Sequence, residues 1–201
     1  VTPANGNVAL DWNAPTDLGG GTLMSYRVDH STDGINWVSD GTTTTTSLVV
    51  RGLTNGTNYR FRVTPVTTQG DGQATIVNGM PFGSSSAPAL LRANSGDGFI
   101  TINWNAPTNT GGLPVAGYQI DLCTYSSCTW TTYVRNTGSS STSTYTFSGL
   151  TNGTQYQARV SAVTGACDET LADTVASCNY YGATVLSTPA TVPSAPQSIT
   201  A

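Results

Sequence analysis

The sequence predicts an all-β protein built from two tandem antiparallel β-sandwiches. Three observations predict it: a long internal repeat, strands in which apolar and polar residues alternate, and turn sequences at short intervals between those strands. A chain of 201 residues has room for about two ordinary domains. No window shows a 3.6-residue apolar period long enough for a core helix.

The internal repeat relates the two halves of the chain. The segment Trp-Asn-Ala-Pro-Thr occurs at 12–16 and again at 104–108, an offset of 92 residues. Leu-Thr-Asn-Gly-Thr occurs at 53–57 and again at 150–154, where the offset has grown to 97. Insertions therefore fall in loops, while the strands keep their lengths.

The repeated segments alternate apolar and polar residues with a period of two. The alternation is clear over residues 8–12 and 100–104, over 26–29, and over 59–63 and 156–160. This period places one face of a strand in a core and the other in solvent, as in an antiparallel sandwich. Asn-Gly, Gly-Gly and Asp-Gly turn signals separate these strands.

The order of these signals resembles the fibronectin type III family, in the style of bacterial secreted or surface copies. An early Trp is followed by Pro, Gly-Gly, a Tyr-x-Val or Tyr-x-Ile strand and Leu-Thr-Asn-Gly-Thr-x-Tyr, twice over nearly the whole chain. The resemblance implies two immunoglobulin-like sandwiches of seven strands. It implies that Trp12 and Trp104 are buried strand-B residues. It also implies that Tyr59 and Tyr156 form tyrosine corners, whose hydroxyls bond to the backbone near the E–F turn.

The repeat also gives the expected domain boundaries. We expect a first domain over 1–83 and a second over 84–193. Residues 87–93, Ala-Pro-Ala-Leu-Leu-Arg-Ala, are typical of a strand A for the second domain. The first domain has no such segment, so its own strand A is expected to be missing. Residues 194–201 are expected to form strand A of a following domain or of a neighbouring copy.

A head-to-tail arrangement follows from the spacing of two prolines. Pro88 lies 16 residues before Trp104, and Pro196 would lie 17 residues before Trp12 if one copy led into the next. We therefore predict one repeat unit of a longer assembly, repeated covalently or joined by β-strand addition, with an arbitrary chain boundary as the alternative. The predicted inter-copy strand consists of Pro196, Gln197, Ser198, Ile199 and Thr200.

Charge is scarce and slightly acidic. Charged residues make up 9% of the chain, the net charge is −4, and there is no Lys. Without a basic cluster, the release of counterions that drives nucleic-acid binding has no source. No apolar run approaches the roughly 20 residues of a membrane span. We expect no nucleic-acid partner and no membrane-spanning segment.

Four cysteines lie in the second half of the chain, whereas the single histidine, His30, lies in the first. Because no Cys-x-x-Cys motif occurs, a zinc site has little support. We predict two local disulfides, Cys123–Cys128 at the tip of the C–C′ hairpin and Cys167–Cys178 across an insertion in the F–G loop. Disulfides imply an oxidising, extracellular environment.

The F–G insertion has two possible interpretations. It is either an acidic loop that presents a surface to a partner or a Ca²⁺ ion, or a surface insertion stapled against proteolysis. Three acids so close together do not by themselves form an oxygen cage, so we predict no metal site. These acids are Asp168, Glu169 and Asp173.

The sequence offers no catalytic constellation. A Ser/His/Asp arrangement would depend on His30, whose neighbour Asp29 is an alternating surface position. We therefore predict that the chain is not an enzyme and needs no cofactor. Asn55 and Asn152 begin Asn-Gly-Thr sequons, but Asn-Gly also supplies the backbone angles of a tight E–F turn, which we favour.

Two charged pairs are expected on the outer face of the sheet that holds strands C and F. Asp29 and Arg62 in the first domain match Asp121 and Arg159 in the second. We expect each pair to lie exposed across neighbouring strands, where it would add about 0.2–1 kcal/mol.

These features favour a structural or spacer repeat unit of an extracellular tandem array, fibre or filament, with neighbouring copies or repeats as partners. The alternative is an adhesive or carbohydrate-binding accessory module of a secreted enzyme, with a cell-surface or polysaccharide ligand. The choice rests on analogy, since one fold hosts many functions. A binding module needs exposed aromatic residues, for which the candidates are Tyr125, Tyr133, Tyr180 and Tyr181.

Overall fold

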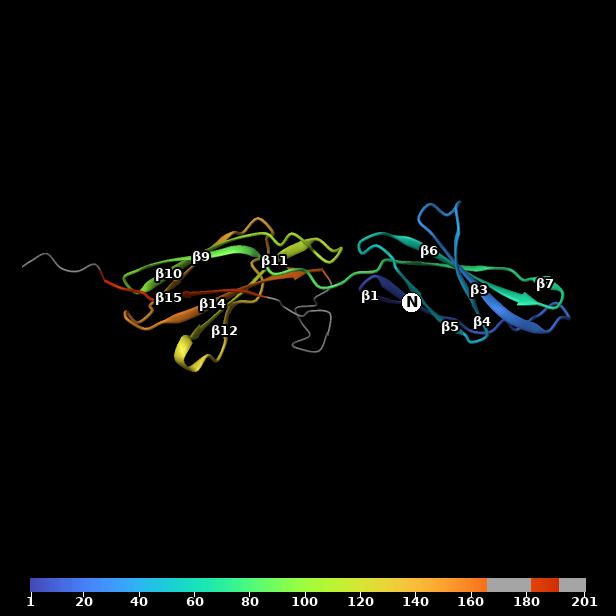
Figure 1. The fold of residues 1–201 in the computed structure, drawn as a ribbon, viewed down its shortest axis with the longest axis horizontal. Coiled ribbons are helices and arrows are strands. Elements are labelled where there is room, and N and C mark those ends of the chain that lie inside the picture. Colours follow the sequence, from blue (N-terminus) through green and yellow to red (C-terminus); the bar gives the residue numbers. More distant parts are fainter. Residues whose placement is uncertain (166–181, 192–201) are drawn as a thin grey trace, which may run out of the picture. The chain divides into compact units, whose positions relative to one another are not determined.

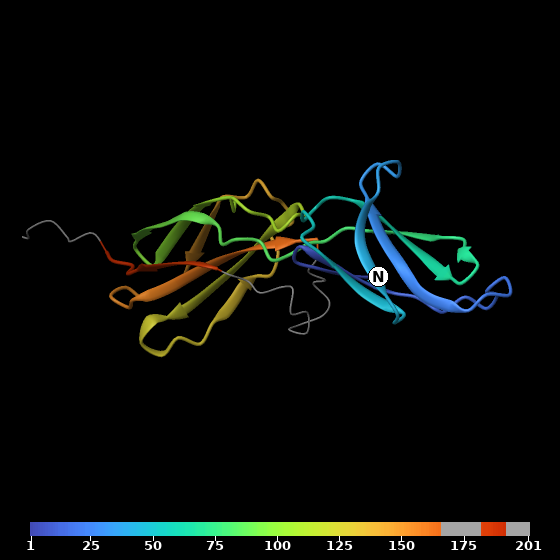
Figure 2. The same ribbon diagram turned by 45° about the vertical axis from the view of Figure 1, so that its right-hand side comes forward.

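The computed structural model describes residues 1–165 and 182–191. The chain divides into two compact units, the first of Val1–Ser84 with Gly111–Leu113 and the second of Ser85–Thr110 with Pro114–Ala201. Each unit consists of antiparallel strands in two sheets (Figures 1 and 2). Within the described ranges the only helical segment is a 3₁₀ turn, η1 (Tyr125–Ser127). The predicted fold class, tandem all-β sandwiches, is confirmed.

The first unit has one sheet of three strands in the order β1-β2-β5. Its second sheet has the order β4-β3-β6, and both β7 and β8 pair with β6. These correspond to the A-B-E and C′-C-F-G sheets of the sandwich. The strands are β1 (Thr2–Ala4), β2 (Asn7–Asp11), β3 (Leu23–Ser31), β4 (Val38–Thr43), β5 (Ser47–Arg51), β6 (Tyr59–Thr67), β7 (Gly70–Asp71) and β8 (Thr75–Gly79).

The second unit repeats this plan with the sheet orders β13-β10-β9 and β12-β11-β14-β15. Its strands are β9 (Ala89–Gly96), β10 (Phe99–Asn105), β11 (Val115–Thr124), β12 (Thr131–Val134), β13 (Thr144–Ser148), β14 (Tyr156–Thr164) and β15 (Ala183–Ser187).

Each unit has its own hydrophobic core, to which both of its sheets contribute alternate residues. Burying each large side chain stabilises the fold by about 1.5–3 kcal/mol. In the first unit the core includes Val8, Leu10, Tyr26, Val28, Val50, Phe61 and Val63. In the second it includes Ile100, Ile102, Trp104, Tyr118, Ile120, Leu122, Phe147 and Val160.

Strand A differs between the two units and corrects one prediction. In the second unit β9 is eight residues long and pairs with β10 from Gly96 opposite Phe99 to Ala89 opposite Asn105, with a bulge between Asn103 and Asn105. We predicted that the first unit lacks strand A. Instead, a shortened strand A is present as the three residues of β1, which pair with β2. A tight turn brings this segment back onto β2. Gly6 occupies the left-handed backbone region there, with φ of 67°, which glycine adopts without steric cost.

Candidate binding surfaces

The turn between strands E and F is tied to its own domain in the same way in both units. The Tyr59 hydroxyl accepts a hydrogen bond from the backbone amide of Thr54, at 3.1 Å. The Tyr156 hydroxyl accepts the equivalent bond from Thr151, also at 3.1 Å. Each tyrosine begins its F strand, so this bond holds the preceding turn against the start of that strand.

We expect Tyr59→Phe to lower the free energy of unfolding of the first domain by about 1 kcal/mol. The substitution keeps the ring but removes the hydroxyl that accepts the partly buried Thr54 amide bond. Tyr156→Phe is the matched comparison, and its loss should be smaller because the Thr151 bond is exposed to water. Urea denaturation of both variants measures the difference, and a larger loss in Tyr156→Phe would contradict it.

The asparagines of the two Asn-Gly-Thr sequons link the E–F turn to the A–B turn. Asn55 Oδ1 accepts a hydrogen bond from the amide of Gly6 at 2.8 Å, and Asn152 Oδ1 accepts one from Gly98 at 2.9 Å. Each asparagine also donates from Nδ2 to the side chain just before that glycine, at 2.7 Å. Both side chains are therefore engaged within their own domain. The sequence indicated the turn, but not these side-chain links.

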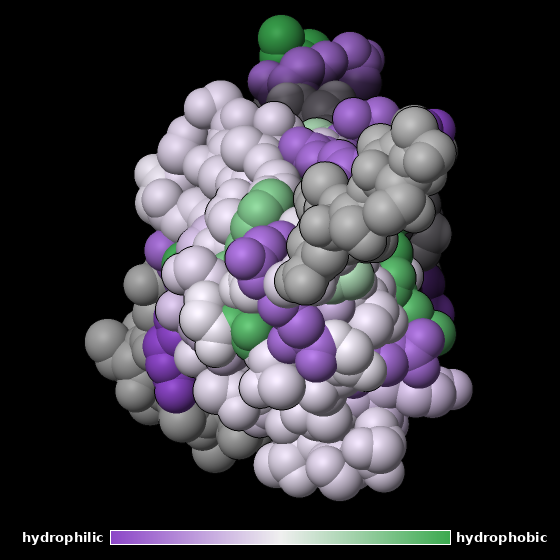
Figure 3. All heavy atoms as spheres, turned by 90° about the vertical axis from the view of Figure 1, so that its left-hand side faces the viewer, coloured by the Kyte–Doolittle hydropathy of each residue, from purple (hydrophilic) through white to green (hydrophobic). Residues whose placement is uncertain are grey.

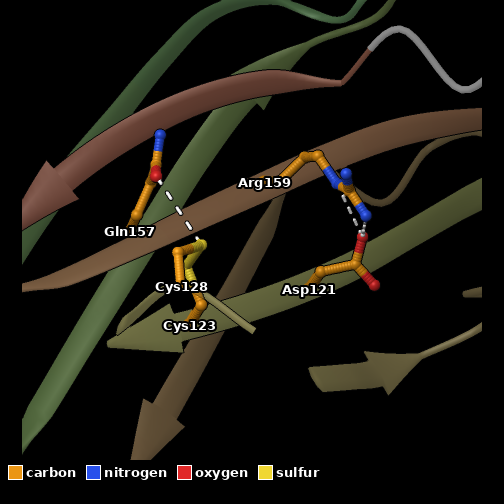
Figure 4. The surroundings of a disulfide bond; sticks show 5 residues. All are labelled: Asp121, Cys123, Cys128, Gln157 and Arg159. Atoms are coloured by element: carbon orange, nitrogen blue, oxygen red, sulfur yellow. Dashed lines mark hydrogen bonds and ion pairs between the residues drawn. A yellow bond between two sulfur atoms is a disulfide. The ribbon is translucent and has the colours of Figure 1, made fainter. Parts of the chain in front are cut away.

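The C–C′ hairpin of the second domain is closed by a disulfide between Cys123 and Cys128, with the Cα atoms 5.0 Å apart (Figure 4). Cys123 is buried at the end of β11. Gln157 Oε1 lies 3.9 Å from Cys128 Sγ, a packing contact because a disulfide sulfur carries no hydrogen. The second predicted disulfide, Cys167–Cys178, lies outside the described residues.

The equivalent hairpin of the first domain is held by hydrogen bonds instead. Ser31 lies opposite Arg60, as Cys123 lies opposite Gln157 in the second domain. The Asp33 carboxylate accepts bonds from the amides of Ile35 and Asn36 and from the Ser31 hydroxyl. These bonds, the Ile35 amide first, lower the pKa of Asp33. Their stabilising contribution is therefore present above the ordinary carboxyl pKa of about 4 and is lost as the pH falls below it.

Replacing both Cys123 and Cys128 with serine should destabilise the second domain by about 2 kcal/mol, because the short loop gains freedom in the unfolded chain. The first domain is the control, since the same hairpin there has no disulfide. Thermal unfolding of the double variant should therefore lower one transition only. Loss in both transitions, or in neither, would contradict the assignment.

A carboxylate and an arginine pair across strands C and F in both domains. Asp29 Oδ2 lies 2.9 Å from Arg62 Nη2, and Asp121 Oδ2 lies 2.6 Å from Arg159 Nη2 (Figure 4). The predicted pairing is confirmed, but its expected exposure was wrong. Asp29 is 4% exposed and Asp121 is fully buried. The carboxylates are therefore desolvated. The contribution of about 0.2–1 kcal/mol that we expected for an exposed pair does not apply to them.

A tryptophan covers each of these arginines. The guanidinium of Arg62 lies 4.3 Å from the ring centre of Trp37, and that of Arg159 lies 4.4 Å from Trp130. Each arginine thus contacts a carboxylate and an indole face. Sequence reasoning missed Trp37 and Trp130. The available signal was that each follows a C strand, 93 residues apart.

A pocket of about 500 Å³ opens in the first domain, next to the short strand A. Its wall is mainly apolar and includes Leu10, Trp12, Tyr26, Val63 and Val77. Trp12 is only half-buried beside it.

The equivalent place in the second domain is covered. There Leu91 and Ala93 of β9 pack against the core, and Trp104 is only 3% exposed. The pocket therefore corresponds to the position that the longer strand A fills in the second domain.

The predicted surface aromatics form no common platform in the described part of the chain. Tyr125 and Tyr133 are about half exposed, and Tyr133 and Tyr156 line a small polar pocket of about 250 Å³ beside the C–C′ hairpin. Tyr180 and Tyr181 lie outside the described residues. Pale spheres of near-neutral hydropathy dominate the face in Figure 3, with apolar residues scattered among them.

Among the residues that the structure describes, no three His, Cys, Asp or Glu side chains gather where they could hold a metal ion. His30 instead lies 2.9 Å from Asp40 through Nδ1. No helix in the described ranges is both long enough and apolar enough to cross a bilayer.

Two repeated sandwiches with the same tyrosine, tryptophan and arginine positions define a modular β-sandwich protein. The chain belongs to the fibronectin type III family: the model of the fibronectin type III domain matches residues 2–77 and 86–176. The family is typically one of non-catalytic modules.

The chain matches only 11% and 14% of the length of two similar proteins. Human myomesin-2 is 29% identical over 170 residues, a match that covers 78% of this chain and 11% of myomesin-2. Exoglucanase B of Cellulomonas fimi is 30% identical over 171 residues, which covers 80% of this chain and 14% of that protein. A two-domain fibronectin type III segment of chicken tenascin is 16% identical, with a TM-score of 0.46 over 94% of this chain and 95% of the segment.

Proposed function

We propose that the chain is a non-catalytic structural spacer unit of an extracellular protein, arranged in a tandem array or filament. The observation that carries the proposal is the use of all four tryptophans within the domains. Trp12 and Trp104 contribute to the two interiors, and Trp37 and Trp130 cover the paired arginines. The large aromatic residues that a binding module presents to a ligand are here used for stability.

An extracellular location is supported by the Cys123–Cys128 disulfide, because such bonds persist in oxidising compartments. A tandem arrangement is supported by the relatives, in which the matched region is 11–14% of a longer chain. Assembly from copy to copy would use residues 196–200 as the joining strand, and these lie outside the described residues.

Force spectroscopy on the chain, tethered at both ends, tests the spacer function. A load-bearing spacer should show two separate unfolding events, one for each domain, and should refold when the force is released. Each event should lengthen the chain by roughly 3.3–3.6 Å per unfolded residue. Unfolding in a single step, or failure to refold, would contradict the proposal.

A carbohydrate-binding accessory function is the second candidate. It is favoured by the similarity to Exoglucanase B and by the half-exposed Tyr125 and Tyr133 near the small polar pocket. Retention of the chain on insoluble cellulose, chitin or xylan would support it, provided that Tyr133→Ala abolishes retention and Ile76→Ala does not. The spacer proposal expects no retention on any of these polymers.

A further inference from the structure

We infer that the hydroxyl-rich segments that join strands C′ and E, residues 42–47 in the first domain and 139–144 in the second, are sites of O-linked glycosylation. The inference goes beyond the spacer function. It rests on the extracellular location proposed above, because the transferring enzyme would meet the chain during export. Segments rich in serine and threonine are typical carriers of O-linked sugars.

The two segments share the hydroxyl group and little else. Six consecutive residues carry a hydroxyl in each domain, Thr-Thr-Thr-Thr-Thr-Ser at 42–47 and Ser-Ser-Ser-Thr-Ser-Thr at 139–144. At the offset of 97 residues that relates the E–F turns, the two segments are identical only at Thr45 and Thr142. Serine and threonine thus replace one another, while the hydroxyl is kept at all six positions. Since exposed connections tolerate many polar residues, this agreement points to the chemistry of the hydroxyl.

The backbone of each segment is anchored to its own domain at one matching residue. The carbonyl of Thr46 accepts a hydrogen bond from the Trp12 amide, and the carbonyl of Ser143 accepts one from the Trp104 amide, both at 3.0 Å. Thr46 and Ser143 are nevertheless exposed, and their hydroxyls bond to no atom in the described part of the chain. An enzyme can therefore reach both hydroxyls without unfolding the domain.

Thr44 and Ser140 are the central residues of two similar bends. The residues on either side of Thr44 join their Oγ1 atoms at 2.8 Å, and those on either side of Ser140 join their Oγ atoms at the same distance. The central residue takes no part in this bond. Thr44 and Ser140 are exposed, and within the described ranges their hydroxyls have no hydrogen-bond partner. Each segment thus offers two accessible acceptors.

The reaction is the transfer of a sugar from an activated donor, either a nucleotide sugar or a lipid-phosphate sugar. The hydroxyl oxygen of the chain forms a bond to the anomeric carbon of the sugar, and the bond from that carbon to a phosphate oxygen breaks. The phosphate leaves with the electron pair, and the hydroxyl proton passes to a base of the transferring enzyme. The chain itself supplies only the acceptor hydroxyl.

The position of the segments suggests what the sugars do. Each segment connects two edge strands: in the described part of the chain, β4 and β5 pair on one side only, and so do β12 and β13. Such edges invite pairing with another chain, and proteins commonly protect them with charged residues or proline. Neither β12 nor β13 contains a charged residue or a proline. Sugars on the connecting segment lie where they shield both edges.

Peptide mapping of the chain secreted by its native cells is the first measurement, with electron-transfer fragmentation that leaves each sugar on its residue. We expect hexose or N-acetylhexosamine on Thr44 and Thr46 in one domain and on Ser140 and Ser143 in the other. Thr146 is the matched control. It is exposed too, but it lies within a strand and its hydroxyl bonds to that of the neighbouring strand at 2.9 Å, so it should carry no sugar.

Two double variants assign the sugars to their domains. Thr44→Ala combined with Thr46→Ala should remove the added mass from the first domain alone, and Ser140→Ala combined with Ser143→Ala from the second alone. Thr146→Ala should leave the added mass unchanged. Because all five side chains are exposed, none of these substitutions opens a core, and circular dichroism should show the same fold in every variant.

Sedimentation velocity tests whether the sugars shield the edges. The secreted wild type should stay monomeric as its concentration rises. The secreted variant that combines all four alanines keeps the Cys123–Cys128 disulfide but carries no sugar, and it should associate. Thr146→Ala should behave as the wild type does.

Unmodified peptides over both segments in the secreted chain would overturn the inference, as would a phosphate in place of a sugar, or a sugar confined to hydroxyls within strands. A sugar-free variant that stays as monomeric as the wild type would overturn the shielding of the edges. None of these outcomes alters the two unfolding events under force that test the spacer function.

Discussion

Replacing Trp104 with alanine is expected to lower the free energy of unfolding of the second domain by about 4 kcal/mol. The side chain is 3% exposed and packs edge-on against Tyr118, with the ring centres 5.3 Å apart. The substitution would leave a large cavity in a core that strand β9 covers, and the surrounding strands cannot close it.

The equivalent change in the first domain, Trp12→Ala, is the internal comparison. Trp12 packs on Tyr26 at the same distance, 5.3 Å, but it is only half-buried beside the open pocket. Because folding removes less apolar surface of Trp12 from water, we expect Trp12→Ala to lower the free energy of unfolding by about 2 kcal/mol. Urea denaturation resolves the two effects if each domain gives its own transition. Equal losses would contradict the conclusion that the short strand A leaves Trp12 less covered.

Most of the strands could be predicted because each strand pattern occurs twice in the sequence. Alternation over 8–12 and 100–104, and over 59–63 and 156–160, depends on local sequence and survives in the structure as β2, β10, β6 and β14. A second copy of each pattern distinguishes a real strand from a chance alternation. Two sandwiches followed directly from this agreement between local pattern and repeat.

Features that depend on what covers a surface could not be predicted in this way. Three residues of β1 are too few to show alternation, and only the tight turn at Gly6 brings them onto β2. The tryptophans that stack on Arg62 and Arg159 lie just before β4 and β12, outside the strand pattern that identified the charged pair. Comparison of the repeats predicted that the first domain lacks strand A, but the pocket beside β1 is lined by side chains of several strands and was not predicted.

The Asp121–Arg159 pair of the second domain gives the other large expected effect on the free energy of unfolding. Arg159→Ala should destabilise that domain by about 3 kcal/mol, because it leaves the fully buried Asp121 carboxylate without its charged partner. The control is Arg27→Ala in the first domain. Arg27 pairs with Asp71 at 2.7 Å, where the two side chains are 37% and 46% exposed, and its Nε lies 3.5 Å from Asp29, which keeps the closer Arg62 in this variant. We expect its loss to stay below about 1 kcal/mol.

A third variant separates the cost of an unpaired charge from the value of the pair itself. Asp121→Leu combined with Arg159→Met removes both charges while keeping apolar bulk under Trp130, and should recover most of the stability lost in Arg159→Ala. Urea denaturation of the three variants, followed by circular dichroism, measures the differences. A loss below 1 kcal/mol in Arg159→Ala would mean that water reaches Asp121 despite the indole cover. A double variant no more stable than Arg159→Ala would mean that the pair itself, and not the desolvated carboxylate, provides the stability.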